Sequence, residues 1–368
     1  MRIFLRMTRQ GIYAIAALII LVLILAIGLS SFDEKSAGTV AAEVKGACQN
    51  VTIGFGKEAC YSLELQRVAY FSGPERAFEV LARLQQLDES AKGCHFIAHG
   101  IGYGTFDHNP ADWRSHVNSI DQSCSYGAVH GIIEKHVDSL PEGKLSREYI
   151  PEICGPAPRT PNCNHIVGHL LLVEAQGNIS GALELCSVFN DNKTQLKNCK
   201  SGVFMEHLIA LNLNQHGYSS ESFSASGGNY QKFCRTYHGD DAVACWREIT
   251  HIALMQFNYD PKITFDFCNS AQTGEAAREC KRHTIGQIAT NKDYMIDTLK
   301  YMCRLQQPPD DQTFEKDCYG ELVASLLYSI PKDKEKAVSF CSSLEPEFRD
   351  SCVSRIKKTL ELVSASAD

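Results

Sequence analysis

Sixteen cysteines, all placed after residue 47, constrain this chain more than any other feature of its sequence. An even number of thiols in an exported chain is typical of a disulfide framework rather than of unpaired core cysteines. The later cysteines form close pairs, and the first members of successive pairs recur every 34 to 48 residues. Periods of this size are typical of stacked helical hairpins. With separations of 11 to 15 residues, the pairs are Cys186 with Cys199, Cys234 with Cys245, Cys268 with Cys280, Cys303 with Cys318 and Cys341 with Cys352.

The segments around these pairs predict the same unit each time. A short amphipathic helix ends at the first cysteine, a polar connection follows, and the second cysteine opens a longer helix with apolar residues at three- and four-residue spacing. A disulfide at this place staples the hairpin and constrains the unfolded chain by roughly 3 kcal/mol. The remaining cysteines suggest Cys48 with Cys60, Cys154 with Cys163, and Cys94 with Cys124.

Strand patterns and hairpin-turn dipeptides are scarce, which predicts an all-α fold. The expected architecture is an N-terminal transmembrane helix followed by a solenoid or toroid of helical hairpins stapled by disulfides. Four regions are expected along the chain: 1–30 as membrane anchor or signal peptide, 31–45 as flexible tether, 46–160 as a histidine-rich helical region, and 161–360 as disulfide-stapled repeats.

The N-terminus predicts export. Three arginines, the last of them Arg9, precede an apolar run over residues 11–29, and Asp33 and Glu34 follow it. The run is long enough to cross a bilayer, and positive charge before it places the N-terminus inside. An uncleaved anchor is favoured over a signal peptide, whose apolar region is usually shorter. The expected location is the plasma membrane, as a single-pass protein held in the lipid bilayer by residues 11–29, with a periplasmic or extracellular C-terminal domain.

Composition excludes one class of partner. Hydrophobic residues make up 44% of the chain and charged residues 21%, which is ordinary for a globular protein. The formal net charge is −7, and no long basic run follows the N-terminus. Since nucleic-acid binding requires a basic face, no nucleic-acid partner is expected.

Histidines follow the cysteines in a regular way. The chain has 13, and eight of them lie shortly after a cysteine that is expected to begin a helix. In three helices the separation is six residues, as between Cys163 and His169. Equivalent positions of a repeat fall on equivalent surfaces, so these side chains are expected to form a row on one side of the longer helices.

Two histidine pairs favour a metal site. His95 and His99 are four residues apart, as are His165 and His169, and this spacing places both imidazoles on one helix face. Two such imidazoles can hold one metal ion. The expected transition metal is iron, zinc or copper. His251 and His283 are weaker candidates, and any single histidine can instead be a hydrogen-bonded core or surface residue. The expected ligands are His95, His99, His130, His165, His169 and His207, with Glu206 as a catalytic base.

These patterns leave two functions open. The first is a membrane-anchored extracytoplasmic helical-repeat protein with a histidine-lined metal site, a candidate metalloenzyme in which the ion activates water or dioxygen. The second is a non-enzymatic helical-repeat scaffold that binds a protein partner at the cell envelope. Converging imidazoles favour the first and dispersed imidazoles the second. A thiol-exchange protein is disfavoured because no Cys-x-x-Cys motif is present.

Overall fold

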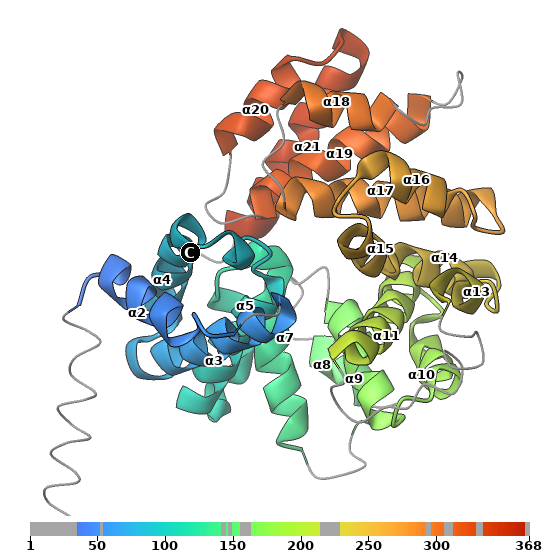
Figure 1. Cartoon of the computed structure of the whole chain (residues 1–368). Helices are drawn as coiled ribbons and strands as arrows, with labels where there is room; N and C mark the ends of the chain where they lie inside the picture. The colour runs from blue at the N-terminus through green and yellow to red at the C-terminus, as the bar shows by residue number, and fades with distance from the viewer. Residues whose placement is uncertain are drawn as a thin grey trace, which may run out of the picture.

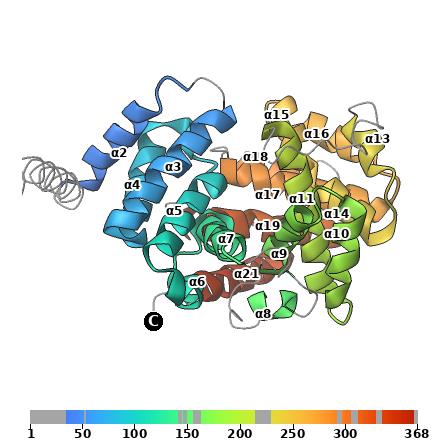
Figure 2. The same ribbon diagram turned by 90° about the horizontal axis from the view of Figure 1, so that it is seen from below.

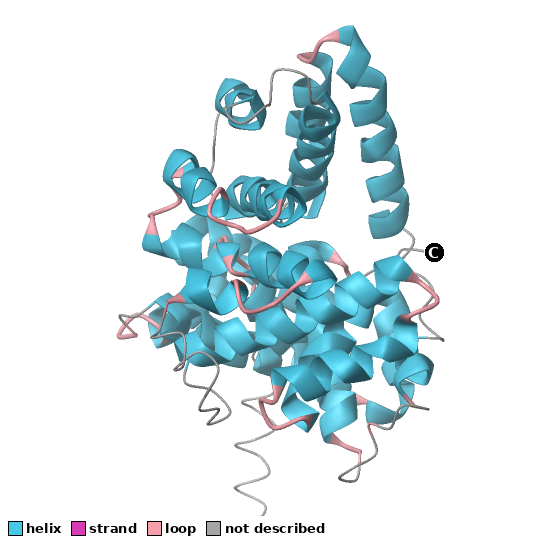
Figure 3. Ribbon diagram, turned by 90° about the vertical axis from the view of Figure 1, so that its right-hand side faces the viewer, coloured by secondary structure: helices cyan, strands magenta, loops and turns pink. Residues whose placement is uncertain are grey.

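The computed structural model describes residues 35–51, 54–140, 145, 149–154, 163–213, 229–291, 296–304, 312–328 and 334–364. Every regular element within these residues is an α-helix or a short 3-10 helix, which confirms the all-α expectation (Figure 3). The expected membrane segment at residues 11–29 lies outside the described residues. Among the helices that are described, none combines the length and the apolar character needed to cross a membrane.

The first part of the chain supplies helices α2 (Ala37–Ala47), α3 (Gly54–Ser72), α4 (Pro74–Leu87), η1 (Glu89–Ala91), α5 (His95–His108), η2 (Pro110–Asp112), α6 (Trp113–Ser119), α7 (Ser123–Asp138), α8 (Ile150–Cys154) and α9 (Cys163–Glu174). The second part supplies α10 (Ile179–Leu185), η3 (Cys186–Phe189), α11 (Lys193–Leu213), α13 (Tyr230–Cys234), α14 (Gly239–Glu248), α15 (Thr250–Gln256), α16 (Pro261–Cys268), α17 (Gly274–Asn291), α18 (Ile296–Arg304), α19 (Gln312–Tyr328), α20 (Lys334–Ser342) and α21 (Pro346–Ser364).

All sixteen cysteines are paired, and no free cysteine remains. The pairing agrees with the expected one. This includes the bond between Cys94 and Cys124, the two cysteines that remained after the closely spaced pairs had been assigned. Many disulfides indicate an oxidising, extracytoplasmic environment. The bonds are Cys48–Cys60, Cys94–Cys124, Cys154–Cys163, Cys186–Cys199, Cys234–Cys245, Cys268–Cys280, Cys303–Cys318 and Cys341–Cys352.

In six of the hairpins the longer helix begins earlier than expected, whereas α9 begins at Cys163 as expected. The second cysteine of a pair was expected to open this helix, but Cys199 lies six residues after Lys193, the first residue of α11. The same offset separates Cys245 from the start of α14, and it recurs in α3, α17, α19 and α21. The residues just before the second cysteine therefore form the first turns of these helices. Acidic residues such as Asp240 and Asp241 are favourable there because they face the positive end of the helix dipole.

Residues 31–45 were expected to form a flexible tether, and this prediction is wrong for the second part of the range. Residues 37–47 form helix α2, which the side chain of Ser36 caps by accepting a hydrogen bond from the backbone N–H of Thr39. Val40, Ala41 and Val44 lie on one face of α2 and are buried, where the helix packs against α4. Small residues suggested flexibility, but alanine favours a helix and the valines give it a face to bury.

The longer helices stack on one another in chain order. α3 packs against α5 and α5 against α7, while α9 packs against α11, which begins a row that continues through α14, α17 and α19 to α21. Contacts between α7 and α9 join the two series, and α19 touches α7, so the row bends back on itself. Figures 1 and 2 show the C-terminal helices beside both earlier groups, with α7, α9 and α11 toward the middle and α2, α4 and α10 outside.

Buried side chains form two clusters. One runs from Val40 to Cys280 and contains side chains from α2 to α17, and the other runs from Leu254 to Ile356. The first cluster extends across residue 160, where the histidine-rich region was expected to meet the repeats. That expected boundary stays a prediction.

Glycines allow the inner helices to approach closely. A Cβ atom on Gly202 of α11 would lie 1.9 Å from the carbonyl oxygen of His165 in α9. We expect Gly202→Ala to lower the free energy of unfolding by about 1–3 kcal/mol, because the two backbones would have to separate. Urea unfolding followed by circular dichroism measures this. Gly46→Ala is the matched control: no atom lies within 4 Å of its Cβ position, so we expect a gain of about 0.5–1 kcal/mol. Equal midpoints for both variants would contradict the close packing of α9 and α11.

Candidate metal centre

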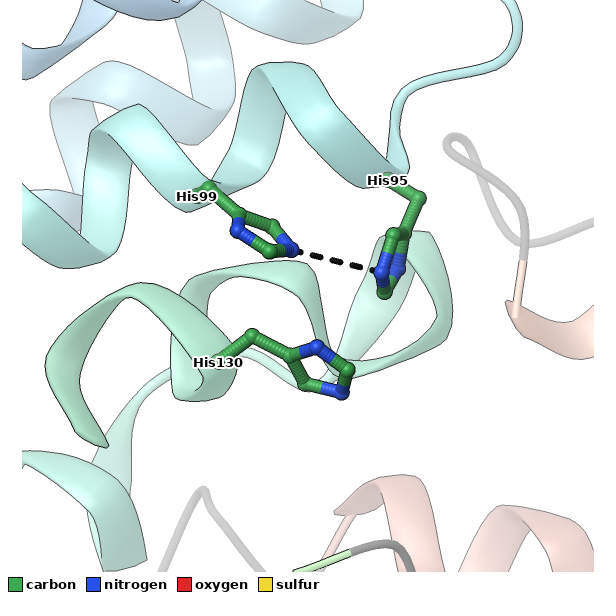
Figure 4. Close-up of side chains that lie close together, drawn as sticks. All are labelled: His95, His99 and His130. Atoms are coloured by element: carbon green, nitrogen blue, oxygen red, sulfur yellow. Dashed lines mark hydrogen bonds between the residues drawn. The ribbon is translucent and has the colours of Figure 1, made fainter. Parts of the chain in front are cut away.

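Three imidazoles from two helices form the first group. His95 and His99 lie on successive turns of α5, and their Nε2 atoms are 3.3 Å apart. α7 brings the ring of His130 beside both, with centroid distances of 4.7 Å to His95 and 5.2 Å to His99 (Figure 4). One nitrogen from each ring falls within a common 4.8 Å span. For comparison, two ligands about 2.1 Å from a tetrahedral ion lie roughly 3.4 Å from each other.

The other ring nitrogens of His95 and His99 are held by protein groups. Nδ1 of His95 lies 3.0 Å from the carbonyl oxygen of Cys124, and Nδ1 of His99 lies 3.1 Å from Oε2 of Glu134. A carbonyl only accepts hydrogen bonds, so Nδ1 of His95 donates and Nε2 carries the lone pair. Such partners orient the histidine ligands of metal sites through the nitrogen that does not bind the ion. Both Nε2 atoms are therefore directed at the same point.

Glu134 is charged at neutral pH. Burial raises the pKa of its carboxyl group, but the charge and hydrogen bond of His99 outweigh this effect and lower the pKa to about 2. The hydroxyl of Tyr103 also donates a hydrogen bond to Oε2 of Glu134, with an oxygen–oxygen distance of 2.5 Å. The carboxylate thus accepts the proton on Nδ1 of His99 and leaves Nε2 of this ring available as a ligand.

His130 is the least satisfied side chain of the group. It is 1% exposed, and neither of its ring nitrogens has a hydrogen-bond partner within the described part of the chain. A buried polar group without a partner costs about 1–3 kcal/mol. Burial lowers the pKa of His130 well below its ordinary value, and the surrounding imidazoles lower it further. A neutral imidazole with an unused nitrogen is the form that binds a metal ion.

A second histidine pair faces His130 from α9. The ring of His130 lies 5.8 Å from that of His165 and 5.6 Å from that of His169, measured between centroids. The Nε2 atoms of His165 and His169 are 3.1 Å apart, and Nδ1 of His169 lies 2.9 Å from Oε2 of Glu206. The sulfur of Met205 lies 3.2 Å from Nε2 of His165. The arrangement of His95, His99 and Glu134 thus recurs in a second pair of helices, with a thioether added.

The pKa values of the two imidazoles of this pair shift in opposite directions. Burial lowers the pKa of His165 to about 3. Burial also lowers the pKa of His169, but the hydrogen bond to Glu206 and the negative charges of Glu206 and Glu134 outweigh it, so the pKa is raised. Without a metal ion, a protonated His169 can donate to the neutral Nε2 of His165. A bound cation would take the place of that shared proton.

Close helix contacts and a left-handed turn produce this geometry. The Cβ positions of Gly127 and Gly131 in α7 lie 2.2 Å from the carbonyl oxygens of His95 and His99, so only glycine lets α7 approach α5 this closely. At the start of α7, Cys124, Ser125 and Tyr126 have φ values of 56°, 53° and 66°. An L-residue in this region costs roughly 1–2 kcal/mol. This turn places the Cys124 carbonyl against His95, and backbone strain of this kind gathers at functional sites.

The structure brings together five of the six expected ligands. His207 does not join them: its ring stacks on Phe233 at a centroid distance of 5.2 Å, and burial lowers its pKa to about 4. Successive residues of a helix are about 100° apart, so Glu206 and His207 face different neighbours. Glu206, the expected catalytic base, contacts Nδ1 of His169 and so acts as a positioning residue in this geometry.

Sequence reasoning did not assign three contributors to the site. The Cys124 carbonyl depends on the left-handed turn, for which no residue pattern is diagnostic. Tyr103 follows His99 by four residues, and this spacing could have placed it on the same helix face. Met205 immediately precedes Glu206, but its contact with His165 depends on how α11 crosses α9.

Comparisons with protein-family models, with curated proteins and with solved structures yield no match for this chain. The function is therefore inferred from the site itself.

Proposed function

We propose that this chain is an extracytoplasmic metal-binding protein that holds a transition-metal ion on Nε2 of His95, Nε2 of His99 and a ring nitrogen of His130. One observation carries the proposal: His130 is buried with both nitrogens unpartnered, next to two Nε2 atoms that are directed at each other. Three imidazole ligands suit zinc, copper or iron. They also leave one position of a four-coordinate ion open, as in catalytic zinc sites.

His165 and His169 supply ligands for a second ion in this proposal. Their Nε2 atoms converge on one point, and the thioether of Met205 lies beside His165. Imidazole together with a thioether suits copper, because sulfur ligands favour the softer Cu(I) ion. The centre then contains two adjacent ions, with His130 between them. In the proposed metalloenzyme, the open position at the first ion takes water or dioxygen.

The site is proposed to act outside the cytoplasm on a membrane-anchored chain. Eight disulfides support the compartment, since such bonds persist in oxidising surroundings. The anchor is the apolar run at residues 11–29, preceded by arginines. A scaffold that only binds a protein partner would not require imidazoles from α5, α7 and α9 to converge, so the metal-binding proposal is favoured over it.

Metal content tests the proposal. The full chain is exported into an oxidising compartment and purified without chelators or a histidine tag, and its metals are measured by plasma mass spectrometry. We expect one or two equivalents of a transition metal in this centre, and the loss of the first ion in a variant carrying His95→Ala and His99→Ala. His238→Ala is the control, because His238 is exposed and lies at the start of α14. Equal metal content in all three proteins, or none in any after reconstitution, would reject the proposal.

A further inference from the structure

We infer that a separate metal-ion site lies where α14, α15 and α17 meet, formed by Glu248, His251 and His283. It uses none of the ligands of the centre proposed above and does not depend on that proposal. The three side chains come from the end of α14, the first turn of α15 and the middle of α17. One ligand atom from each falls within a common 4.8 Å span.

The distances fit the edges of a coordination polyhedron. Nε2 of His251 and Nε2 of His283 are 3.2 Å apart. Oε2 of Glu248 lies 3.6 Å from the first nitrogen and 3.9 Å from the second. Ligands about 2.1 Å from a tetrahedral ion are separated by roughly 3.4 Å. The two distances from the Glu248 oxygen are longer than the donor–acceptor distance of a good hydrogen bond. All three distances are close to the separation expected between ligands of one shared ion.

The Glu248 carboxylate is already oriented for this role. Its Oε1 accepts hydrogen bonds from the hydroxyl of Ser201 and from Nε of Arg247. The second of these has a donor–acceptor distance of 3.0 Å. Its Oε2 is left facing the two imidazoles. The side chain is 1% exposed, so its charge is removed from water. Hydrogen bonds to the outer oxygen of a metal-binding carboxylate are the usual means of fixing its direction.

The charged groups beside the site form a network of ion pairs. Arg247 is also bonded to Glu279, whose Oε1 lies 2.9 Å from Nη1, so its positive charge is shared between two carboxylates. Glu279 in turn pairs with Arg282 and Lys197. Arg282 further pairs with Glu321. Three basic groups and three carboxylates therefore balance in this network. Arg247 contacts Oε1 of Glu248, and Oε2 of the same carboxylate is the oxygen that faces the two imidazoles.

The contacts of His283 make Nε2 the nitrogen that can bind an ion: it lies 3.2 Å from Nε2 of His251 and 3.4 Å from Nε2 of Gln287, an amide group that can only donate. His283 is 8% exposed, and its Nδ1 is buried without a hydrogen-bond partner in the part of the chain that the structure describes. If Nδ1 holds the proton, Nε2 has the lone pair and faces Nε2 of His251. A direct hydrogen bond between the two rings would instead place the proton between the two Nε2 atoms. Oε2 of Glu248 would then lie 3.6 Å and 3.9 Å from these atoms, without a good hydrogen bond to either. An ion at this point would contact Nε2 of both histidines and Oε2 of Glu248, with the proton of His283 on Nδ1.

The donor set identifies the kind of ion. Two imidazoles and one carboxylate are the ligands of many zinc sites and of mononuclear iron(II) sites. No sulfur atom belongs to this group, unlike the pair formed by His165 and His169. We therefore assign the site to a divalent ion of borderline hardness, zinc or iron(II), whose remaining positions are open to water or to a small ligand.

Cobalt(II) is a suitable probe, because its visible absorption reports ligand type and geometry. The full chain is stripped of metal and titrated with Co²⁺, first as the unaltered protein and then as Glu248→Gln and His251→Gln. We expect each variant to lose one equivalent of bound Co²⁺, or to bind it at least 100-fold more weakly, with the far-ultraviolet circular dichroism unchanged. Gln keeps the volume of Glu248 and the hydrogen bond with Ser201. His251→Gln, at a partly exposed position, provides the answer if Glu248→Gln fails to fold.

His238→Gln serves as the matched control and should bind as much Co²⁺ as the unaltered chain. A variant lacking His130 separates this site from the other centre, since its loss should leave the absorption of the Glu248 site in place. The inference is overturned if Glu248→Gln and His251→Gln both bind as many equivalents as the unaltered chain, with equal affinity. It is also overturned if the unaltered chain binds no Co²⁺.

Discussion

Replacing His130 by leucine should abolish metal retention at the first group of imidazoles while making the metal-free protein more stable. Leucine is close to histidine in size and has no polar atom, so it removes two buried nitrogens that have no hydrogen-bond partner. The expected gain is about 1–3 kcal/mol in the free energy of unfolding without metal. Affinity for the first ion should fall at least about 100-fold, since losing even a residue that only orients a ligand costs roughly 10–100-fold.

Chemical unfolding with and without metal, together with a competitive chelator titration, measures both quantities. His207→Leu is the matched control, because His207 is another buried histidine on an inner helix but stacks on Phe233. Its replacement should leave the number of bound metal ions unchanged. Unchanged metal affinity in His130→Leu would show that this ring is not a ligand. A metal-free stability below that of the unaltered chain would show that its nitrogens do have partners.

Removing the bond between Cys94 and Cys124 should weaken both the fold and the site. The bond joins residues 30 apart in sequence. A loop of this size constrains the unfolded chain by about 4 kcal/mol, which is a large part of a typical net stability of about 5–15 kcal/mol. The same bond holds the left-handed turn whose carbonyl accepts a hydrogen bond from His95. The double variant Cys94→Ser, Cys124→Ser should therefore also bind the first ion about 10–100-fold more weakly.

The bond between Cys341 and Cys352 provides the comparison. It joins residues 11 apart in α20 and α21, and its loss should cost about 3 kcal/mol. None of the proposed metal ligands lies in these two helices, so metal affinity should be unchanged, measured at a temperature where both variants are folded. Equal loss of affinity in both variants would mean that the site responds to general destabilisation. No loss in either would remove the proposed role of the Cys124 carbonyl.

Local features of this fold were predictable because they depend on spacing along one helix or one hairpin. Neighbouring cysteines 9 to 15 residues apart can meet only if the chain turns back between them, and those pairs formed as expected. Histidines four apart share a helix face, which is why the pairing of His95 with His99 and of His165 with His169 could be anticipated.

Features that depend on how helices cross were not predictable in this way. The approach of His130 to both pairs requires α7 to cross α5 over Gly127 and Gly131. Successive residues of a helix differ by about 100° in direction, so one can face the candidate metal centre while the next faces other side chains. Glu206 and His207 differ in this way. The tether was misjudged for a related reason, since the helical segment 37–47 is stabilised by burial against α4, which lies well away in sequence.

The order of the disulfides has a consequence for how the protein matures. The cysteines pair consecutively along the chain, the first with the second, the third with the fourth and so on, so no two disulfide loops interleave. As a chain is threaded through a membrane from its N-terminus, the first thiol to follow an unpaired cysteine is then always its native partner. If the chain is exported in this way, oxidation in step with export would produce the native set without reshuffling, and an oxidase alone would suffice where interleaved connectivities need an isomerase.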